Sequence, residues 1–173
     1  KQMQEDKARK SKKFVRIEIL ANYFTPEDGI FKDTYGSGLM EGAELNFGIW
    51  DMLEMWVAIK NFSKRSDPDT AGPESSLRYL PLEGGLKIRF SKGLINPYLG
   101  GGIAYHQYKE ELDSGEVNEK QIGFLGQAGC FIKIAENLVL DIYAHYRHSR
   151  IDIGTEEING GGLHFGAGLG FEF

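Results

Sequence analysis

The chain has 173 residues, which suits one domain with a sizeable core and is short for two. Glycine is abundant at 23 residues, proline is scarce at 5 and aromatic residues reach 12%, a composition that favours strands and tight turns. The net charge of −5 argues against general nucleic-acid binding, and the single cysteine, Cys130, excludes an internal disulfide framework and a cysteine-based metal cluster. The longest uncharged run, from Gly93 to Tyr108, contains Pro97 and is too short for a transmembrane helix.

Eight segments in succession alternate apolar and polar residues with a period of two, the pattern of half-buried strands. The clearest is the fourth, in which Leu86 and Ile88 alternate with Lys87 and Arg89. The predicted strands cover residues 14–24, 39–49, 54–62, 80–91, 97–108, 121–134, 138–149 and 161–173. Four apolar residues fall on the polar side, which predicts local register slips or bulges: Leu20, Trp56, Leu125 and Phe131.

The connections between these segments alternate in length. Long, acidic connections follow the odd-numbered segments, at residues 25–38, 64–76, 109–120 and 150–160, whereas short ones lie around residues 50–53, 92–96 and 135–137. Transmembrane barrels have short periplasmic turns and longer external loops. The sequence therefore predicts an all-β fold, an eight-stranded antiparallel up-and-down transmembrane β-barrel over residues 14–173, with both termini in the periplasm. Residues 1–13 form a predicted basic periplasmic tail.

Alternation alone does not say which face of a barrel points inward, because a soluble ligand-binding barrel would bury the apolar face. Three features favour an apolar face toward lipid. The polar face combines long charged side chains with glycines, as a narrow lumen requires, and its positive and negative charges nearly cancel. Aromatic residues also gather near the predicted strand ends, as in interfacial girdles: Tyr23, Trp50, Trp56, Tyr79, Tyr98, Tyr146 and Phe173.

The charges of the polar face predict a network of ion pairs inside the lumen. The residues expected to form it are Arg16, Glu18, Glu44, Lys60, Glu83, Lys87, Arg89, Lys133, Asp141, Arg147 and Glu172, and Glu54 belongs to the same balance of charges. Each Arg or Lys turned toward lipid would cost roughly 2–4 kcal/mol at the midplane. Six such errors would rival the whole stability of an ordinary domain, of order 5–15 kcal/mol, so the strand register is expected to be tightly fixed.

The last predicted strand ends in Gly168-Leu169-Gly170-Phe171-Glu172-Phe173. This stretch resembles the C-terminal signal of bacterial outer-membrane barrels, and Pro97-Tyr98-Leu99-Gly100-Gly101-Gly102-Ile103-Ala104-Tyr105 is similar to a strand of the OmpA/OmpX/OmpW-like small barrels. The resemblance covers about residues 14–173 and implies a bacterial outer-membrane location. It also implies recognition by the barrel-assembly machinery through the C-terminal strand, with Gly168, Phe171 and Phe173 as the signal.

The most suggestive chemical group is Tyr146-Arg147-His148-Ser149, followed by Glu156 and Glu157. It resembles the lipid A deacylase barrels, which carry a His, a Ser two residues later and a downstream Glu. Here His148 and Ser149 are adjacent and point to opposite faces of a strand. His145 and Ser149 share a face but stand roughly 13 Å apart. Neither pair gives the reach that a nucleophile and its base need.

Three histidines, His106, His145 and His164, share the polar face. The fifth predicted strand is not expected to lie beside the seventh or eighth, so the three are expected to be hydrogen-bonded lumen residues rather than metal ligands. No catalytic residue, metal or cofactor is predicted.

The predicted function is that of a non-enzymatic outer-membrane barrel with a plugged polar lumen, in a structural, surface-interaction or complex-anchoring role. The alternatives are a membrane-embedded lipid A-modifying hydrolase and a soluble barrel that binds a small ligand. The expected partners are outer-membrane lipid and lipopolysaccharide, the barrel-assembly machinery and a further envelope protein, with no nucleic acid. The acidic loops and the basic tail are expected to be solvated segments.

Overall fold

The computed structural model of the chain describes residues 13–27, 29, 32, 36–65, 76–90, 93–112, 115–153, 156–159 and 161–173. Within these residues no helix has the length and apolar character needed to cross a membrane.

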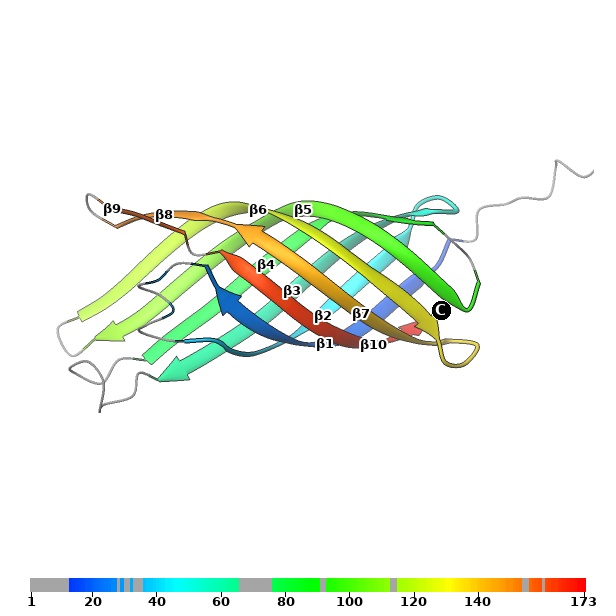
Figure 1. The fold of residues 1–173 in the computed structure, drawn as a ribbon, viewed down its shortest axis with the longest axis horizontal. Coiled ribbons are helices and arrows are strands. Elements are labelled where there is room, and N and C mark those ends of the chain that lie inside the picture. Colours follow the sequence, from blue (N-terminus) through cyan, green and yellow to red (C-terminus); the bar gives the residue numbers. More distant parts are fainter. Residues whose placement is uncertain are drawn as a thin grey trace, which may run out of the picture.

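Eight strands close into an antiparallel barrel (Figure 1). They are β1 (Val15–Pro26), β2 (Gly38–Gly48), β3 (Leu53–Arg65), β4 (Ser76–Arg89), β5 (Ile95–Leu112), β6 (Gly115–Lys133), β7 (Leu138–His148) and β10 (Gly162–Glu172). Each pairs with the next in this order, and β10 pairs with β1 to complete the wall. Two short strands, β8 (Arg150–Ile153) and β9 (Glu156–Asn159), form a separate hairpin between β7 and β10 in the sequence. The predicted eight-stranded antiparallel barrel is confirmed.

Two of the long predicted loops contain more strand than the sequence pattern indicates. β5 and β6 stay paired through residues 109–120 as far as Leu112 and Gly115, and β8 and β9 occupy most of residues 150–160. Figure 1 shows β3, β5 and β6 extending past the ends of β1 and β10 at this end of the barrel. Backbone pairing continues here although the alternation has stopped, because an antiparallel ladder that is polar on both faces can still form.

Side chains alternate between outward and lumen-facing positions along the barrel strands. Leu86, Ile142 and Leu169 are exposed at 48%, 51% and 50%, whereas Lys87 and Asp141 are buried at 1% and 2%. The apolar side chains coat the outside of the cylinder and the charges lie within it, as predicted. A wall of this polarity suits a barrel surrounded by lipid.

The four apolar residues that interrupt the alternation do not mark register slips, and the expectation of bulges there is wrong. Leu20, Trp56, Leu125 and Phe131 all point into the lumen and are buried, and the strand pairing beside each keeps one register. The lumen therefore contains apolar layers between its charged ones.

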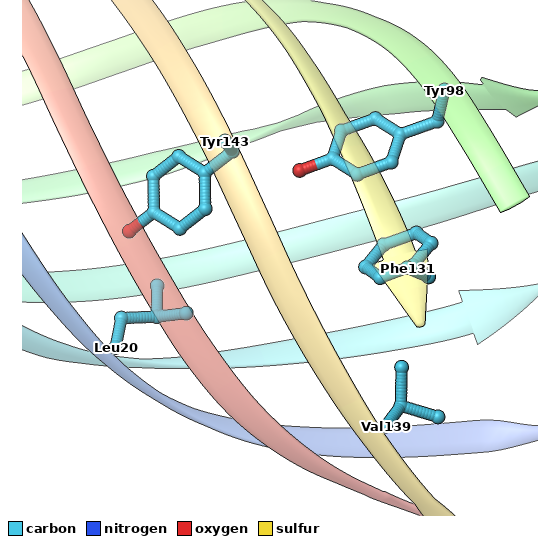
Figure 2. Close-up of a cluster of buried hydrophobic side chains, with 5 residues drawn as sticks. All are labelled: Leu20, Tyr98, Phe131, Val139 and Tyr143. Carbon is cyan, nitrogen blue, oxygen red and sulfur yellow. The ribbon is translucent and has the colours of Figure 1, made fainter. Parts of the chain in front are cut away.

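Glycines on neighbouring strands make room for these large side chains. A Cβ atom at Gly168 would lie 2.7 Å from Leu20 Cδ2. Leu20 belongs to the cluster in Figure 2, which gathers Leu20, Tyr98, Phe131, Val139 and Tyr143 from β1, β5, β6 and β7. A second cluster contains Trp56, Ala58, Ala104 and Leu125. In that cluster Trp56 pairs in register with Gly85 and Leu125 with Gly102. These two glycines let the backbones of β4 and β5 approach closely, because a Cβ atom at Gly85 would collide with Gly101 O and one at Gly102 with Gly84 O.

The predicted aromatic girdle needs a correction. Tyr23, Trp50, Tyr146 and Phe173 are exposed on the outside, as expected. Trp56, Tyr79 and Tyr98 are instead buried in the lumen, because they occupy inward positions of β3, β4 and β5. These three residues were assigned to the girdle because they lie near predicted strand ends, but that position does not determine whether a ring faces lipid or the lumen.

Candidate functional site: the lumen

The polar residues of the lumen fall into three groups along the barrel axis. The short-turn layer lies near the short turns and contains Arg16, Glu18, Glu54, Arg89 and Glu172. The central layer contains Glu44, Asn46, Lys87, Tyr98 and Asp141. The long-loop layer contains Lys60, Glu83, His145, Arg147 and His164.

Arg16 is the hub of the short-turn layer. Its Nε lies 2.7 Å from Glu18 Oε1, its Nη2 2.8 Å from Glu54 Oε2 and its Nη1 3.4 Å from Glu172 Oε2. Arg89 also pairs with Glu54. These ion pairs connect β1, β3, β4 and β10 inside the barrel, and hydrogen-bonded geometry of this kind is what a buried charge requires.

Aromatic rings cover the cations of the same layer. The Arg16 guanidinium carbon lies 3.9 Å from the centre of the Phe131 ring, and the corresponding atom of Arg89 lies 4.7 Å from the centre of the Phe14 ring. Phe14 is buried, and a Cβ atom at Gly48 would lie 2.5 Å from its ring. Cation–π contacts of this kind are strengthened when both groups are shielded from water.

Lys87 organises the central layer. It pairs with Glu44 and donates to Asn46 Oδ1 at 3.2 Å, while Asn46 Nδ2 donates to Glu18 Oε1 at 2.8 Å. Asn46 thereby joins the central layer to the short-turn layer. The two layers form one connected set of hydrogen bonds.

Two tyrosines complete the middle of the lumen, and the sequence analysis did not assign either of them to the site. Tyr98 donates to both oxygens of Asp141, at 2.9 and 3.1 Å, and Tyr143 donates to Asn22 Oδ1 at 2.8 Å. Figure 2 shows both rings among the apolar residues of the first cluster. The alternation of β5 and β7 places both tyrosines at inward positions, and this is the feature of the sequence that could have assigned them to the lumen.

The long-loop layer centres on Glu83. Its Oε2 lies 2.7 Å from Lys60 Nζ, and its Oε1 lies 2.7 Å from Arg147 Nη1. Lys60 Nζ also lies 3.1 Å from His145 Nδ1, and Arg147 Nη2 lies 2.9 Å from His164 Nε2. The two imidazoles stack with ring centres 4.4 Å apart.

Aromatic rings lie in the lumen beyond this layer. Phe24 meets Phe62 edge to face, with ring centres 5.6 Å apart, and stacks on His164 at 4.5 Å. The hydroxyl oxygen of Tyr79 lies 2.7 Å from His106 Nδ1. All five side chains are buried, so apolar and aromatic surface lies between the charges and the long loops.

The predicted ion-pair residues occupy different positions in this arrangement. Asp141 is held by Tyr98 rather than by a salt bridge among the described contacts, and Lys133 is half-buried at the end of β6 with no described ion pair. Nine of the predicted residues take part in the ion pairs given above: Arg16, Glu18, Glu44, Lys60, Glu83, Lys87, Arg89, Arg147 and Glu172.

The residues considered as a hydrolase site do not form a catalytic arrangement. Ser149 is buried and donates to Gln121 Oε1 at 3.0 Å, whereas His148 is exposed on the outer wall. His145 lies in the long-loop layer beside Lys60. The side chains of Glu156 and Glu157 lie outside the part that the structure describes.

His145 and His164 are cross-strand neighbours, and His106 is bonded to Tyr79. Within the described residues, no group of three or more His, Cys, Asp or Glu side chains is arranged to hold a metal ion.

The end of β10 lies against the start of β1. Phe173 N donates to Val15 O at 2.9 Å, and Phe171 and Phe173 are exposed, with ring centres 4.9 Å apart. Gly168 points inward and accommodates Leu20. The predicted basic tail lies outside the described residues except for Lys13.

The profile of the outer membrane protein beta-barrel domain family matches residues 5–171. The chain belongs to this family. Its place is therefore the bacterial outer membrane, and the outward apolar wall described above is the surface that meets lipid. Comparison with curated protein sequences gives no significant match.

Several solved outer-membrane barrels share the fold of this chain at low sequence identity. Neisserial surface protein A is 16% identical with a TM-score of 0.68, over 93% of this chain and 97% of that one. The N-terminal β-barrel domain of Pseudomonas aeruginosa OprF is 14% identical with a TM-score of 0.62, over 95% and 100%. Outer membrane protein W of E. coli is 14% identical with a TM-score of 0.56, over 96% and 100%.

Proposed function

We propose that this chain is a non-enzymatic outer-membrane barrel with a closed lumen, in a structural, surface-interaction or complex-anchoring role. The observation that carries the proposal is the succession of buried side chains along the axis, from Phe14 through the three polar layers to Phe24. Every layer contains charges held by partners on other strands. Such a filling leaves the outer wall, the loops and the chain ends as the surfaces through which the protein acts.

The energetics of the layers support a closed state. Removing one member of a buried ion pair costs roughly 3–5 kcal/mol, because the remaining charge is left without a partner. A sugar-sized solute would have to displace several such pairs at once, in all three layers. The free energy needed to break these ion pairs together exceeds the binding free energy that a small solute could contribute.

Permeation of a small sugar tests the closed lumen. Liposomes that contain the refolded protein are diluted into isotonic arabinose, with a general porin as the positive control, and the heat-dependent gel shift checks folding. No swelling beyond that of protein-free liposomes is expected. Swelling at a rate comparable to the porin would overturn the proposal.

The proposed orientation has the short turns and both chain ends in the periplasm. Support comes from the pairing of Val15 with Phe173 at the end that carries the short turns, and from the general rule that outer-membrane barrels place short turns inside. The long-loop end then faces outward, where the rim meets lipopolysaccharide.

Cysteine labelling in whole cells tests this orientation. In a Cys130→Ser background, Glu136→Cys in the short turn between β6 and β7 is expected to react with a membrane-impermeant maleimide only after the outer membrane is permeabilised. Glu27→Cys, at the other end of the barrel, is the matched control and is expected to react in intact cells. The opposite pattern would contradict the orientation.

Recognition by the barrel-assembly machinery is proposed to use Phe171 and Phe173. Both rings are exposed at the C-terminal end of β10, and an edge-pairing partner would meet them there before β10 pairs with β1. Phe173→Ala is expected to reduce the heat-modifiable, membrane-inserted fraction several-fold. Phe165→Ala, an exposed aromatic on the same strand, is the matched control and is expected to insert normally. Equal loss in both variants would argue against a specific signal.

A further inference from the structure

The long-loop layer is a closed cycle of five buried side chains. Glu83 accepts hydrogen bonds from Lys60 and from Arg147, each at 2.7 Å. The two stacked imidazoles complete the cycle. Lys60 Nζ lies 3.1 Å from His145 Nδ1, and Arg147 Nη2 lies 2.9 Å from His164 Nε2. β3, β4, β7 and β10 are thus joined across the lumen through one carboxylate and two imidazoles.

The cycle requires both imidazoles to be neutral. Lysine and arginine have only donors, so His145 Nδ1 and His164 Nε2 must accept. A protonated imidazole has no acceptor, and it would turn an N–H group toward a cation in each case. The second nitrogen of each ring, His145 Nε2 and His164 Nδ1, is buried without a hydrogen-bond partner. In the neutral rings these second nitrogens already carry the hydrogen, so an added proton goes to His145 Nδ1 or His164 Nε2, where it faces Lys60 or Arg147 and finds no acceptor. The carboxylate oxygen Glu83 Oε1 lies 3.7 Å from His145 Nε2.

Positive groups dominate the surroundings of the rings. The titratable neighbours are Lys60 on β3, Glu83 and Lys87 on β4, His106 on β5 and Arg147 on β7, with Glu44 of β2 acting on Lys60. The facing positions on β1 and β6 are Phe24 and Gln127, which carry no charge. With both rings protonated, four cations would share Glu83 as their nearest carboxylate. Like charges at this separation in a shielded site repel strongly.

We propose that His145 and His164 form a proton-operated lock on the long-loop half of the lumen. The closed cycle keeps both rings neutral, whereas rings that water reaches take up protons at about pH 5, so acid shifts the population toward an open state in which water and small solutes enter as far as Trp56. The proposal rests on the closed lumen proposed above. It gives the barrel a further activity, the acid-dependent admission of small solutes into a chamber open at the long-loop end.

The lock acts on one half of the lumen only. The short-turn and central layers contain no histidine among the described residues. Phe24 stacks directly on His164, so movement of that ring also loosens the aromatic closure at the mouth. Trp56 lies below the lock, four residues before Lys60 on β3, and is buried in the second apolar cluster.

Trp56 offers a direct readout, because the chain has 2 tryptophans and the other, Trp50, is exposed. In a Trp50→Phe background, all tryptophan fluorescence comes from Trp56. Quenching by acrylamide is measured in the folded barrel in lipid vesicles, at pH 7.5 and at about pH 5. The quenching constant is expected to be low at pH 7.5 and to rise about threefold or more in acid.

The test variant replaces both rings with neutral acceptors, as His145→Asn and His164→Gln, which can still receive the hydrogen bonds of Lys60 and Arg147. Its quenching is expected to stay low at both pH values. His148→Gln, on the outer wall of the same strand as His145, is the matched control and should respond to acid as the parent does. Each single variant is expected to show a smaller rise, which gives a second comparison if the double variant does not fold.

The outcomes separate the two proposals. Strong quenching at pH 7.5 would overturn the closed lumen itself. Weak quenching at both pH values in the parent would leave the closed lumen intact and overturn the lock. An acid response that persists unchanged in the folded double variant would also overturn the lock.

Discussion

Arg16 and Glu54 form an ion pair inside the barrel, with Nη2 and Oε2 2.8 Å apart, although 38 residues separate them in the chain. The pair joins β1 to β3 over the intervening β2, and both side chains are almost completely shielded from water. Neither charge has access to solvent. Each therefore depends on its protein partners for stabilisation.

Removal of one partner should be more damaging than removal of both. Arg16→Met leaves Glu54 and Glu18 short of a cation and is expected to lower the free energy of unfolding by about 3–5 kcal/mol. Glu54→Gln should be similarly damaging because Arg16 and Arg89 both lose a carboxylate. The double variant is expected to lose less than the sum of the two. Urea titration of the refolded barrel in lipid vesicles gives all three values, and strict additivity would contradict the coupling.

A side chain at position 168 is expected to destabilise the barrel, because the Leu20 side chain occupies the space beside Gly168. Gly168→Val would place a side chain against Leu20 Cδ2, which a Cβ atom alone would approach to 2.7 Å. Overpacking of this kind costs roughly 1–3 kcal/mol. Leu20→Ala in the same chain should restore part of the loss. The control is Gly126→Ala, where a Cβ atom would meet no atom within 4 Å, and its urea midpoint should be nearly unchanged.

The outward wall should reject charge according to depth in the membrane. Leu169→Arg, on the outward face of β10, is expected to lower the free energy of unfolding by about 2–4 kcal/mol. Leu94→Arg, in the short turn between β4 and β5, should cost about 0–1 kcal/mol because the side chain reaches the interface. Both residues are exposed in the protein, so a difference between them reports the lipid environment rather than packing. Equal effects would contradict a membrane-spanning position for Leu169.

The alternation in the sequence was sufficient to predict the wall of the barrel. Lys87 and Leu86 alternate in sequence and occupy opposite faces in the structure, and the same holds for Asp141 and Ile142. The prediction worked because a strand fixes the direction of each side chain from its backbone alone. It failed for Trp56, since polarity was used to assign faces and the lumen also contains an apolar cluster that buries the indole. It also missed the hairpin of β5 and β6, where no apolar face is present.

The site was less predictable than the wall. The sequence indicates which charges face inward, but the partner of each charge depends on the curvature of the barrel. Glu83 meets Lys60 from the neighbouring strand and Arg147 from the far wall, and no spacing in the chain encodes the second contact. Tyr98 was assigned to the interface because aromatic residues are common there. Its pairing with Asp141 depends on the distance across the lumen, which the sequence does not report.

The pairing of β1 with β10 also determines when the protein can fold. The first strand leaves the ribosome long before its final neighbour has been synthesised, and until β10 arrives its backbone N–H and C=O groups have no partner on that side. A product truncated after β7 would present two open edges to other chains. Insertion into the membrane and closure of the wall are therefore expected to occur together as one late, cooperative event.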